Sequence, residues 1–217
     1  MNIRSGFDAD LNVLKQSIVQ LGEEAVHALD HALDAFKNQD QTLMEKVIKN
    51  DDFINKLELE INEKATRLIA MQQPVASDLR KIIVALKVSS DLERVGDLAV
   101  DIAKGAKRLN DQAVIDFGAQ VIELAEMAKG MLTTSLQAYE AGDVLQAQKI
   151  SHFDDNVDAQ YKLFIKHLFT SLHEQGNAEY ITQLAFLGRY LERIGDYSTN
   201  IAEWTIYEVN GQRFVLN

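Results

Sequence analysis

Hydrophobic residues recur along this chain at the spacing of amphipathic α-helices. Leu92, Val95, Ala99, Ile102 and Ala103, for example, fall on one stripe about 100° wide when each residue is rotated by about 100°. Polar and turn-forming residues interrupt this pattern and leave six amphipathic stretches of about thirty residues each. The interruptions lie at residues 38–40, 73–74, 110–111, 141–143 and 175–177.

The second half of the chain repeats the first. Residues 92–97 read Leu-Glu-Arg-Val-Gly-Asp, and residues 191–196 read Leu-Glu-Arg-Ile-Gly-Asp, 99 positions later. Earlier in each half, Asp51-Asp52 is echoed by Asp154-Asp155 at an offset of 103. The second copy has therefore lost four residues near its last interhelical turn, in a loop where deletions are tolerated.

Six long helices in two repeats predict an all-α protein. Because sequential helices joined by short turns run antiparallel, each repeat should form an up-down-up bundle about 45 Å long. Pro74 is expected in the first turn of the third helix, where its missing N–H costs nothing. We expect a first repeat over 1–110 and a second over 111–217, packed side by side or end to end as one compact unit.

Composition narrows the class of protein. Of 217 residues, 47% are hydrophobic and 25% are charged, with one proline and 7% aromatic residues, which favours long helices around a buried core. A formal net charge of −11 argues against nucleic-acid binding, because phosphate-backbone binding requires clustered lysine and arginine. The absence of cysteine excludes thiolate zinc sites and iron–sulfur clusters, so any metal must be held by oxygen or imidazole ligands.

The sequence also predicts a soluble, cytoplasmic protein. No stretch approaches the roughly eighteen consecutive apolar residues of a membrane-spanning helix. The start of the chain carries Arg4, Asp8 and Asp10 in place of the basic-then-apolar pattern of a secretory signal. The lack of cysteine fits a reducing compartment.

Acidic residues four apart are the most unusual feature of the repeated motif. Glu93 and Asp97 repel each other as helical neighbours, and aspartate is a poor residue for a helix interior, yet Glu192 and Asp196 repeat the arrangement. These acidic ladders fall opposite the apolar stripe of their helices. Because this unfavourable acidic pair occurs in both copies, we expect it to serve a function in both.

Carboxylates at this spacing, with more from a neighbouring helix, suit hard or borderline cations, which relieve the repulsion. The alternative is an ordinary solvated helix surface, which is the usual role of exposed acidic residues. Arg94 and Arg193 are expected to form salt bridges beside the ladders, or else to contact a partner. The candidate metal ligands are Asp51, Asn55, Glu93, Asp97 and Asp101 in the first repeat and Asp154, Asp158, Glu192, Asp196 and Asn200 in the second.

The chain resembles the PhoU family of bacterial phosphate-signalling accessory proteins over essentially its whole length. The resemblance rests on the two Leu-Glu-Arg-x-Gly-Asp motifs and on residues 73–80, which read Gln-Pro-Val-Ala-Ser-Asp-Leu-Arg. It implies two three-helix repeats with an E/D-x-x-x-D motif in each, and iron or zinc clusters bound by the residues named above. Asn55 and Asn200 stand where a carboxylate would bind better, so the two sites need not be equivalent.

The same resemblance implies a regulator and not an enzyme. PhoU-like proteins repress the phosphate-starvation response when phosphate is plentiful, by linking the ATP-driven phosphate transporter to the sensor histidine kinase. The expected partners are therefore the kinase, the transporter ATPase and a second copy in a homodimer, with membrane association only through partners. The sequence agrees, because it has no P-loop, no glycine-rich dinucleotide turn and no serine elbow.

A ferritin-like di-iron oxidase, or a metal-storage helical bundle, is the alternative. Such oxidases use a Glu-x-x-His from each of two helices, and this chain has one, Glu24 to His27. His31 lies four residues further on, a spacing that can bind metal, but the equivalent second-copy positions are Gly130 and Thr134. Partly exposed helix surface is the expected role of both histidines.

Overall fold

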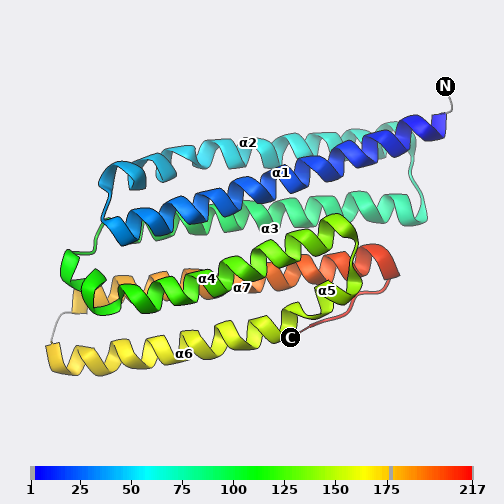
Figure 1. Cartoon of the computed structure of the whole chain (residues 1–217). Coiled ribbons are helices and arrows are strands. Elements are labelled where there is room, and N and C mark those ends of the chain that lie inside the picture. Colours follow the sequence, from blue (N-terminus) through cyan, green and yellow to red (C-terminus); the bar gives the residue numbers. More distant parts are fainter. Residues whose placement is uncertain (1–2, 176–177, 217) are drawn as a thin grey trace.

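The structure, a computed structural model, describes residues 3–175 and 178–216. All regular secondary structure in these ranges is α-helical, which confirms the predicted all-α class (Figure 1). Six helices are long and one is short. They are α1 (Ile3–Asn38), α2 (Gln41–Gln72), α3 (Ala76–Ala106), α4 (Asp111–Ala141), α5 (Val144–Gln148), α6 (Ile150–Gln175) and α7 (Ala178–Asn210).

The helices form two antiparallel bundles that lie side by side along their length (Figure 1). The first bundle contains α1, α2 and α3, and the second contains α4 to α7. The bundles meet where α3 packs against α7 and where α1 packs against α4. Within the described ranges, α2 and α6 contact only helices of their own bundle. Of the two arrangements expected from the sequence, side-by-side packing is therefore the one observed.

Small residues let the two bundles approach closely. A Cβ added to Gly105 of α3 would lie 2.5 Å from the side chain of Leu187 in α7, and one added to Gly22 of α1 would lie 2.5 Å from Leu136 in α4. Larger residues at either glycine would hold the bundles apart. The buried core continues through both halves, so the protein is one packed body.

The turns lie where the sequence placed them, and polar side chains cap the helices that follow. Asp40 accepts hydrogen bonds from the backbone N–H groups of Thr42 and Leu43 at the start of α2. Asp143, the equivalent residue 103 positions later, caps α5 in the same way. Such caps satisfy N–H groups that have no partner inside the helix. The last predicted turn includes residues 176–177, which lie outside the described residues.

Two details differ from the sequence-based expectation. Pro74 lies in the linker before α3 and not in its first turn, because Gln73 ends α2 in a left-handed conformation (φ 46°) and α3 begins only at Ala76. The fifth predicted helix is divided at Lys149, where the N–H of Lys149 bonds to Gln146 O, three residues back. This tighter bonding interrupts the α-helical ladder between α5 and α6.

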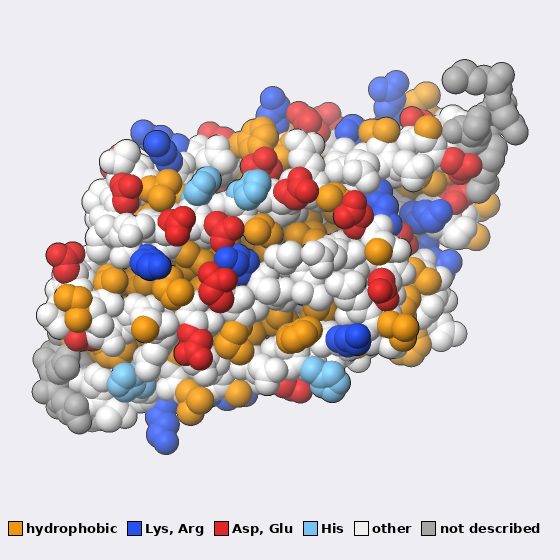
Figure 2. Space-filling model, in the orientation of Figure 1, with side chains coloured by type: hydrophobic (Ala, Val, Ile, Leu, Met, Phe, Trp, Pro, Cys, Tyr) orange, Lys and Arg blue, Asp and Glu red, His pale blue; other side chains and the backbone are white. Residues whose placement is uncertain are grey.

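The surface carries the acidic excess expected from the net charge of −11. Figure 2 shows Asp and Glu side chains spread over the visible face, with apolar side chains between them. None of the helices in the described ranges is long and apolar enough to cross a membrane.

Candidate functional site

Each Leu-Glu-Arg-x-Gly-Asp motif lies on the third long helix of its bundle, α3 or α7, beside the helix that carries the earlier acidic pair. In the first half, Asp51 on α2 lies close enough to Asp97 on α3 for the two charges to interact. In the second half, Asp154 and Asp158 on α6 interact in the same way with Asp196 on α7. The structure thus brings together acidic residues that are far apart in the sequence.

In the first half, the glycine of the motif allows this close approach. A Cβ added to Gly96 would lie 2.9 Å from Cδ1 of Ile54 on α2, and one added to Gly195 would lie 3.4 Å from Val157 and 3.7 Å from Asp154 Oδ1 on α6. Sequence reasoning missed this role. Its signal was present, because a glycine stands at the same position of the motif in both copies.

The first acidic cluster consists of Asp51, Asn55, Glu93 and Asp97 on the seam between α2 and α3. Its three carboxylates are half buried, and Asn55 is exposed. Burial is the main cause that raises the pKa of the Asp51 and Glu93 carboxyls, and the negative charge of Asp97 raises each further. The Asn55 amide lies within hydrogen-bonding reach of Asp51. These carboxylates are therefore held together against their mutual repulsion.

Arg94 offsets part of that repulsion. Its Nη1 lies 3.0 Å from Asp97 Oδ2, and its Nε lies 3.5 Å from Glu93 Oε2. This confirms the predicted salt bridge for the first copy. Arg193 differs, since its Nη2 donates a hydrogen bond to the Tyr197 hydroxyl at 2.9 Å, although its charge still acts on Asp196.

The second acidic cluster consists of Asp154, Asp158, Glu192 and Asp196, on the seam between α6 and α7. Burial is again the main cause that raises the pKa of the Glu192 and Asp196 carboxyls. The negative charge of Asp196 raises the pKa of Glu192 further, and that of Asp154 raises the pKa of Asp196 further. Thr199 Oγ1 donates a hydrogen bond to Asp154 Oδ1 at 3.1 Å. Other ion pairs join Lys162 to Asp158, at 3.1 Å, and Arg189 to Glu192.

Asp101 and Asn200 do not join these clusters in the structure and lie instead on the seam between α3 and α7. Asp101 pairs with Lys104 at 3.6 Å. Burial is the main cause that raises the pKa of Tyr190, and the charge of Asp101 raises it further. Asn200 lies within hydrogen-bonding reach of Asp91, whose pKa burial raises to about 6. Asp91 and Tyr190 occupy equivalent positions of the two repeats, as do Asp101 and Asn200.

The clusters hold carboxylate oxygens that have no hydrogen-bond partner. Asp51 Oδ1 in the first cluster and Glu192 Oε2 in the second are both buried and unpartnered. As the described side chains stand, no three acidic or imidazole groups converge as a set of metal ligands, and the ion pairs described above occupy other oxygens. An oxygen-rich, negatively charged donor set with an unpartnered oxygen in each copy fits a hard or borderline cation.

The two histidines considered for a di-iron centre are exposed residues of α1. This confirms the surface role expected for His27 and His31. Glu24 is half buried on the same helix, whereas both acidic clusters lie on other helices. His31 also lines a cavity between α1 and α2, described below.

The fold and its site define a duplicated three-helix-bundle protein in which each half presents an acidic cluster between its second and third long helices. The family model described as "PhoU domain" matches residues 18–106 and again residues 121–205. The chain therefore belongs to the PhoU family.

Curated relatives match this chain over nearly its full length. A phosphate-specific transport system accessory protein PhoU homolog from Clostridium acetobutylicum is 39% identical over 216 residues, which cover 99% of each chain. The phosphate-specific transport system accessory protein PhoU of Escherichia coli is 34% identical over 98% of this chain and 89% of that protein.

Two solved structures share the fold. PhoU from Pseudomonas aeruginosa has a TM-score of 0.87 and 32% sequence identity, covering 95% of this chain and all of that one. The phosphate transport system regulatory protein PhoU from Streptococcus pneumoniae has a TM-score of 0.90 and 30% identity, covering 96% and 99% respectively.

Proposed function

We propose that this chain is a negative regulator of the bacterial phosphate-starvation response, coupling a phosphate ABC transporter to its sensor histidine kinase. Family membership supports this role, because curated relatives of nearly equal length are named as accessory proteins of phosphate-specific transport. The proposed partners are the kinase, the transporter ATPase and a second copy of the chain. The protein acts in the cytoplasm, without catalysis of its own, and reaches the membrane only through these partners.

We also propose that each acidic cluster binds iron or zinc. The carrying observation is the unpartnered, buried carboxylate oxygen in each copy, Asp51 Oδ1 and Glu192 Oε2. Asp51, Glu93 and Asp97 would hold the ion in the first half, and Asp154, Asp158, Glu192 and Asp196 in the second. A bound cation supplies positive charge that neutralises the repelling carboxylates and links two neighbouring helices.

Asn55 lies beside the first set and adds an amide oxygen. Asp101 and Asn200 lie one helical turn beyond Asp97 and Asp196, and they would contribute only to a larger, multinuclear cluster. Since the first set has an amide where the second has a carboxylate, Asn55 against Asp158, the second half should bind a divalent ion more tightly.

The test is a strain whose only copy of the protein carries Asp97→Asn and Asp196→Asn. These changes remove two charges while nearly preserving volume, so the protein should fold and bind little metal. We expect this strain to express phosphate-starvation genes in phosphate-rich medium, and the purified variant to bind the sensor kinase more weakly.

The matched control is Glu60→Gln with Glu140→Gln, which removes the same charge at exposed positions, one in each half. This control should repress normally. Full repression and unchanged kinase binding by a folded, metal-free Asp97→Asn, Asp196→Asn variant would separate the clusters from signalling. Full repression without any form of the protein would contradict the regulatory role itself.

A further inference from the structure

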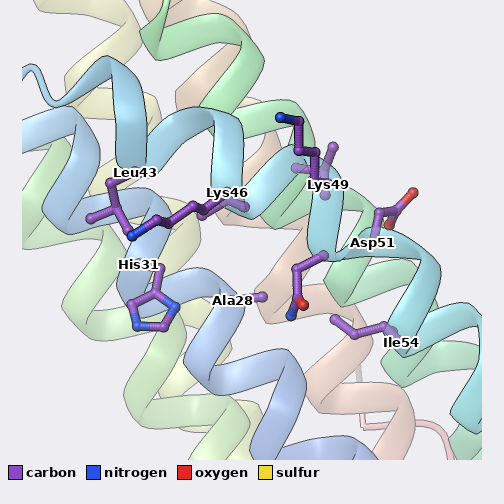
Figure 3. Close-up of a pocket in the computed structure, with 10 residues that line it drawn as sticks. Ala28, His31, Leu43, Lys46, Lys49, Asp51 and Ile54 are labelled. Carbon is purple, nitrogen blue, oxygen red and sulfur yellow. The ribbon is translucent and has the colours of Figure 1, made fainter.

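A cavity of about 490 Å³ opens between α1 and α2 in the first half (Figure 3). Its walls come from both helices, and Val100 of α3 contributes to its lining. Cavities that bind small molecules in proteins typically have volumes of about 300–1,000 Å³. The space is therefore large enough for an organic ligand.

The charged residues that line this cavity are Lys46, Lys49 and Asp51, so its lining carries an excess of positive charge in a protein whose net charge is −11. Lys46 extends from α2 toward the ring of His31 on α1 (Figure 3). Lys49 lies one turn further along α2, and its side chain extends away from His31 (Figure 3). Asp51 also lines the cavity, but its carboxylate points away from His31 (Figure 3). In the part of the chain that the structure describes, Lys46 has no ion-pair partner and the His31 ring has no hydrogen-bond partner.

The cavity also has an apolar wall. Ala28, Val47 and Ile54 line it, and all three are buried residues of the core. A small inorganic anion would leave this apolar surface in contact with water. An anion joined to an apolar group would cover the apolar surface and would pair with Lys46 at the same time.

We propose that this cavity binds a nucleoside phosphate, with its phosphoryl oxygens against Lys46 and His31 and its base on the apolar wall. A phosphate monoester carries about −1.5 to −2 charges near neutral pH and three acceptor oxygens. It can therefore accept hydrogen bonds from the Lys46 ammonium and from the N–H of the His31 ring at the same time.

The internal repeat supplies a comparison within the same molecule. Met131 occupies the position equivalent to Ala28, and its Sδ lies 3.6 Å from the point where a Cβ on Gly195 would stand. Thr134, equivalent to His31, donates its hydroxyl hydrogen bond to Gly130 O at 2.7 Å. The second half thus keeps the acidic cluster but carries different residues at two of the positions that line the cavity.

This proposal does not depend on metal binding, although Asp51 belongs both to the cavity and to the first acidic cluster. The test is calorimetric titration of the metal-free full chain with ADP, GDP, adenosine and inorganic phosphate. We expect saturable binding of one or both nucleotides. Adenosine and inorganic phosphate should each bind at least about tenfold more weakly, because each lacks half of the contacts.

Two variants and one control locate the site. Ala28→Met introduces the residue of the second half and should fill the cavity, and Lys46→Ala removes a cation at an exposed position. Each should weaken nucleotide binding by about tenfold or more. The control is Lys56→Ala, an exposed lysine of the same helix that pairs with Glu60 at 4.0 Å outside the cavity. It should change the affinity less than about twofold.

Circular dichroism and denaturant unfolding would show that each variant is folded. The proposal is overturned if neither nucleotide binds saturably, or if binding survives unchanged in both Ala28→Met and Lys46→Ala. If inorganic phosphate binds as tightly as the nucleotides, the proposed contact between the base and the apolar wall is overturned. The regulatory and metal proposals are unaffected by any of these results, because the titration uses neither metal nor partner proteins.

Discussion

Gly96 of α3 lies directly against Ile54 of α2, with no room between them for a methyl group. A Cβ on Gly96 would meet Cδ1 of Ile54 at 2.9 Å and Cγ2 at 3.0 Å. Ile54 is buried, with 1% of its surface exposed, so a larger residue at position 96 would require this side chain or α2 to shift. This contact sets the spacing between α2 and α3, and with it the distance between Asp51 and Asp97.

Gly96→Ala should therefore destabilise the protein. Overpacking against Ile54 costs about 1–3 kcal/mol, and the better helix propensity of alanine returns about 0.5–1 kcal/mol. We expect a net loss of about 1 kcal/mol in the free energy of unfolding, measured with denaturant. The variant should also bind less metal in the first cluster, because α2 is displaced from α3.

Gly195→Ala is the matched change in the second half, where the new Cβ would stand at an ordinary contact distance of 3.4 Å from Val157. Here the helix propensity should dominate, so stability should be unchanged or higher by up to about 1 kcal/mol. Equal destabilisation by both substitutions would show that the motif glycine does not set the helix spacing in the first half alone.

The carboxyl of Glu208 in α7 should make the stability of the protein depend on pH. Burial raises the pKa of its carboxyl above the ordinary value of 4.5, and Lys15, Lys81 and Arg80 only partly oppose this. Because the folded carboxyl holds its proton more tightly than the unfolded one, its favourable contribution is complete below the unfolded pKa. That contribution is lost as the pH rises through the folded pKa.

Glu208→Gln removes the carboxyl and, with it, the loss of stability that its ionisation causes. The stability of the variant relative to the parent should therefore rise as the pH increases above 4.5, as measured by denaturant unfolding at several pH values. A relative stability that falls over this range would mean that the ion pair between Lys15 and Glu208, at 3.9 Å, outweighs burial.

The protein should not turn over ferrous iron with oxygen. His27, the single histidine of a Glu-x-x-His pair, is exposed on α1, and the acidic clusters lie on other helices. Oxygen consumption by the iron-loaded protein should end after at most one turnover for each iron bound, and His27→Ala should not change it. Sustained turnover that disappears in His27→Ala would favour the oxidase alternative.

Periodicity and turn residues predicted the helices well because long amphipathic segments carry a strong local signal. The same local reasoning failed at Pro74 and Lys149. The preceding helix α2 ends at Gln72 and α3 begins only at Ala76, so Pro74 lies in the linker between them. At Lys149 the sequence has no proline or glycine to mark the division of the helix.

The candidate site was predictable only in part. Spacing alone placed Asp97 and Asp101 on one ladder, but the contact between α3 and α7 draws Asp101 toward Tyr190. Such sharing of a helix between two packing partners depends on tertiary structure. Gly96 likewise acquires its role only when the side chain facing it, Ile54, is known.

The most direct test of the account is anomalous diffraction from crystals of the full chain loaded with iron or zinc, recorded on both sides of the absorption edge. We expect a peak between Asp51 and Asp97, a second beside Asp196, and neither in the Asp97→Asn, Asp196→Asn variant. Metal-loaded crystals in which both positions are empty, with Arg94 still paired to Asp97, would contradict this prediction.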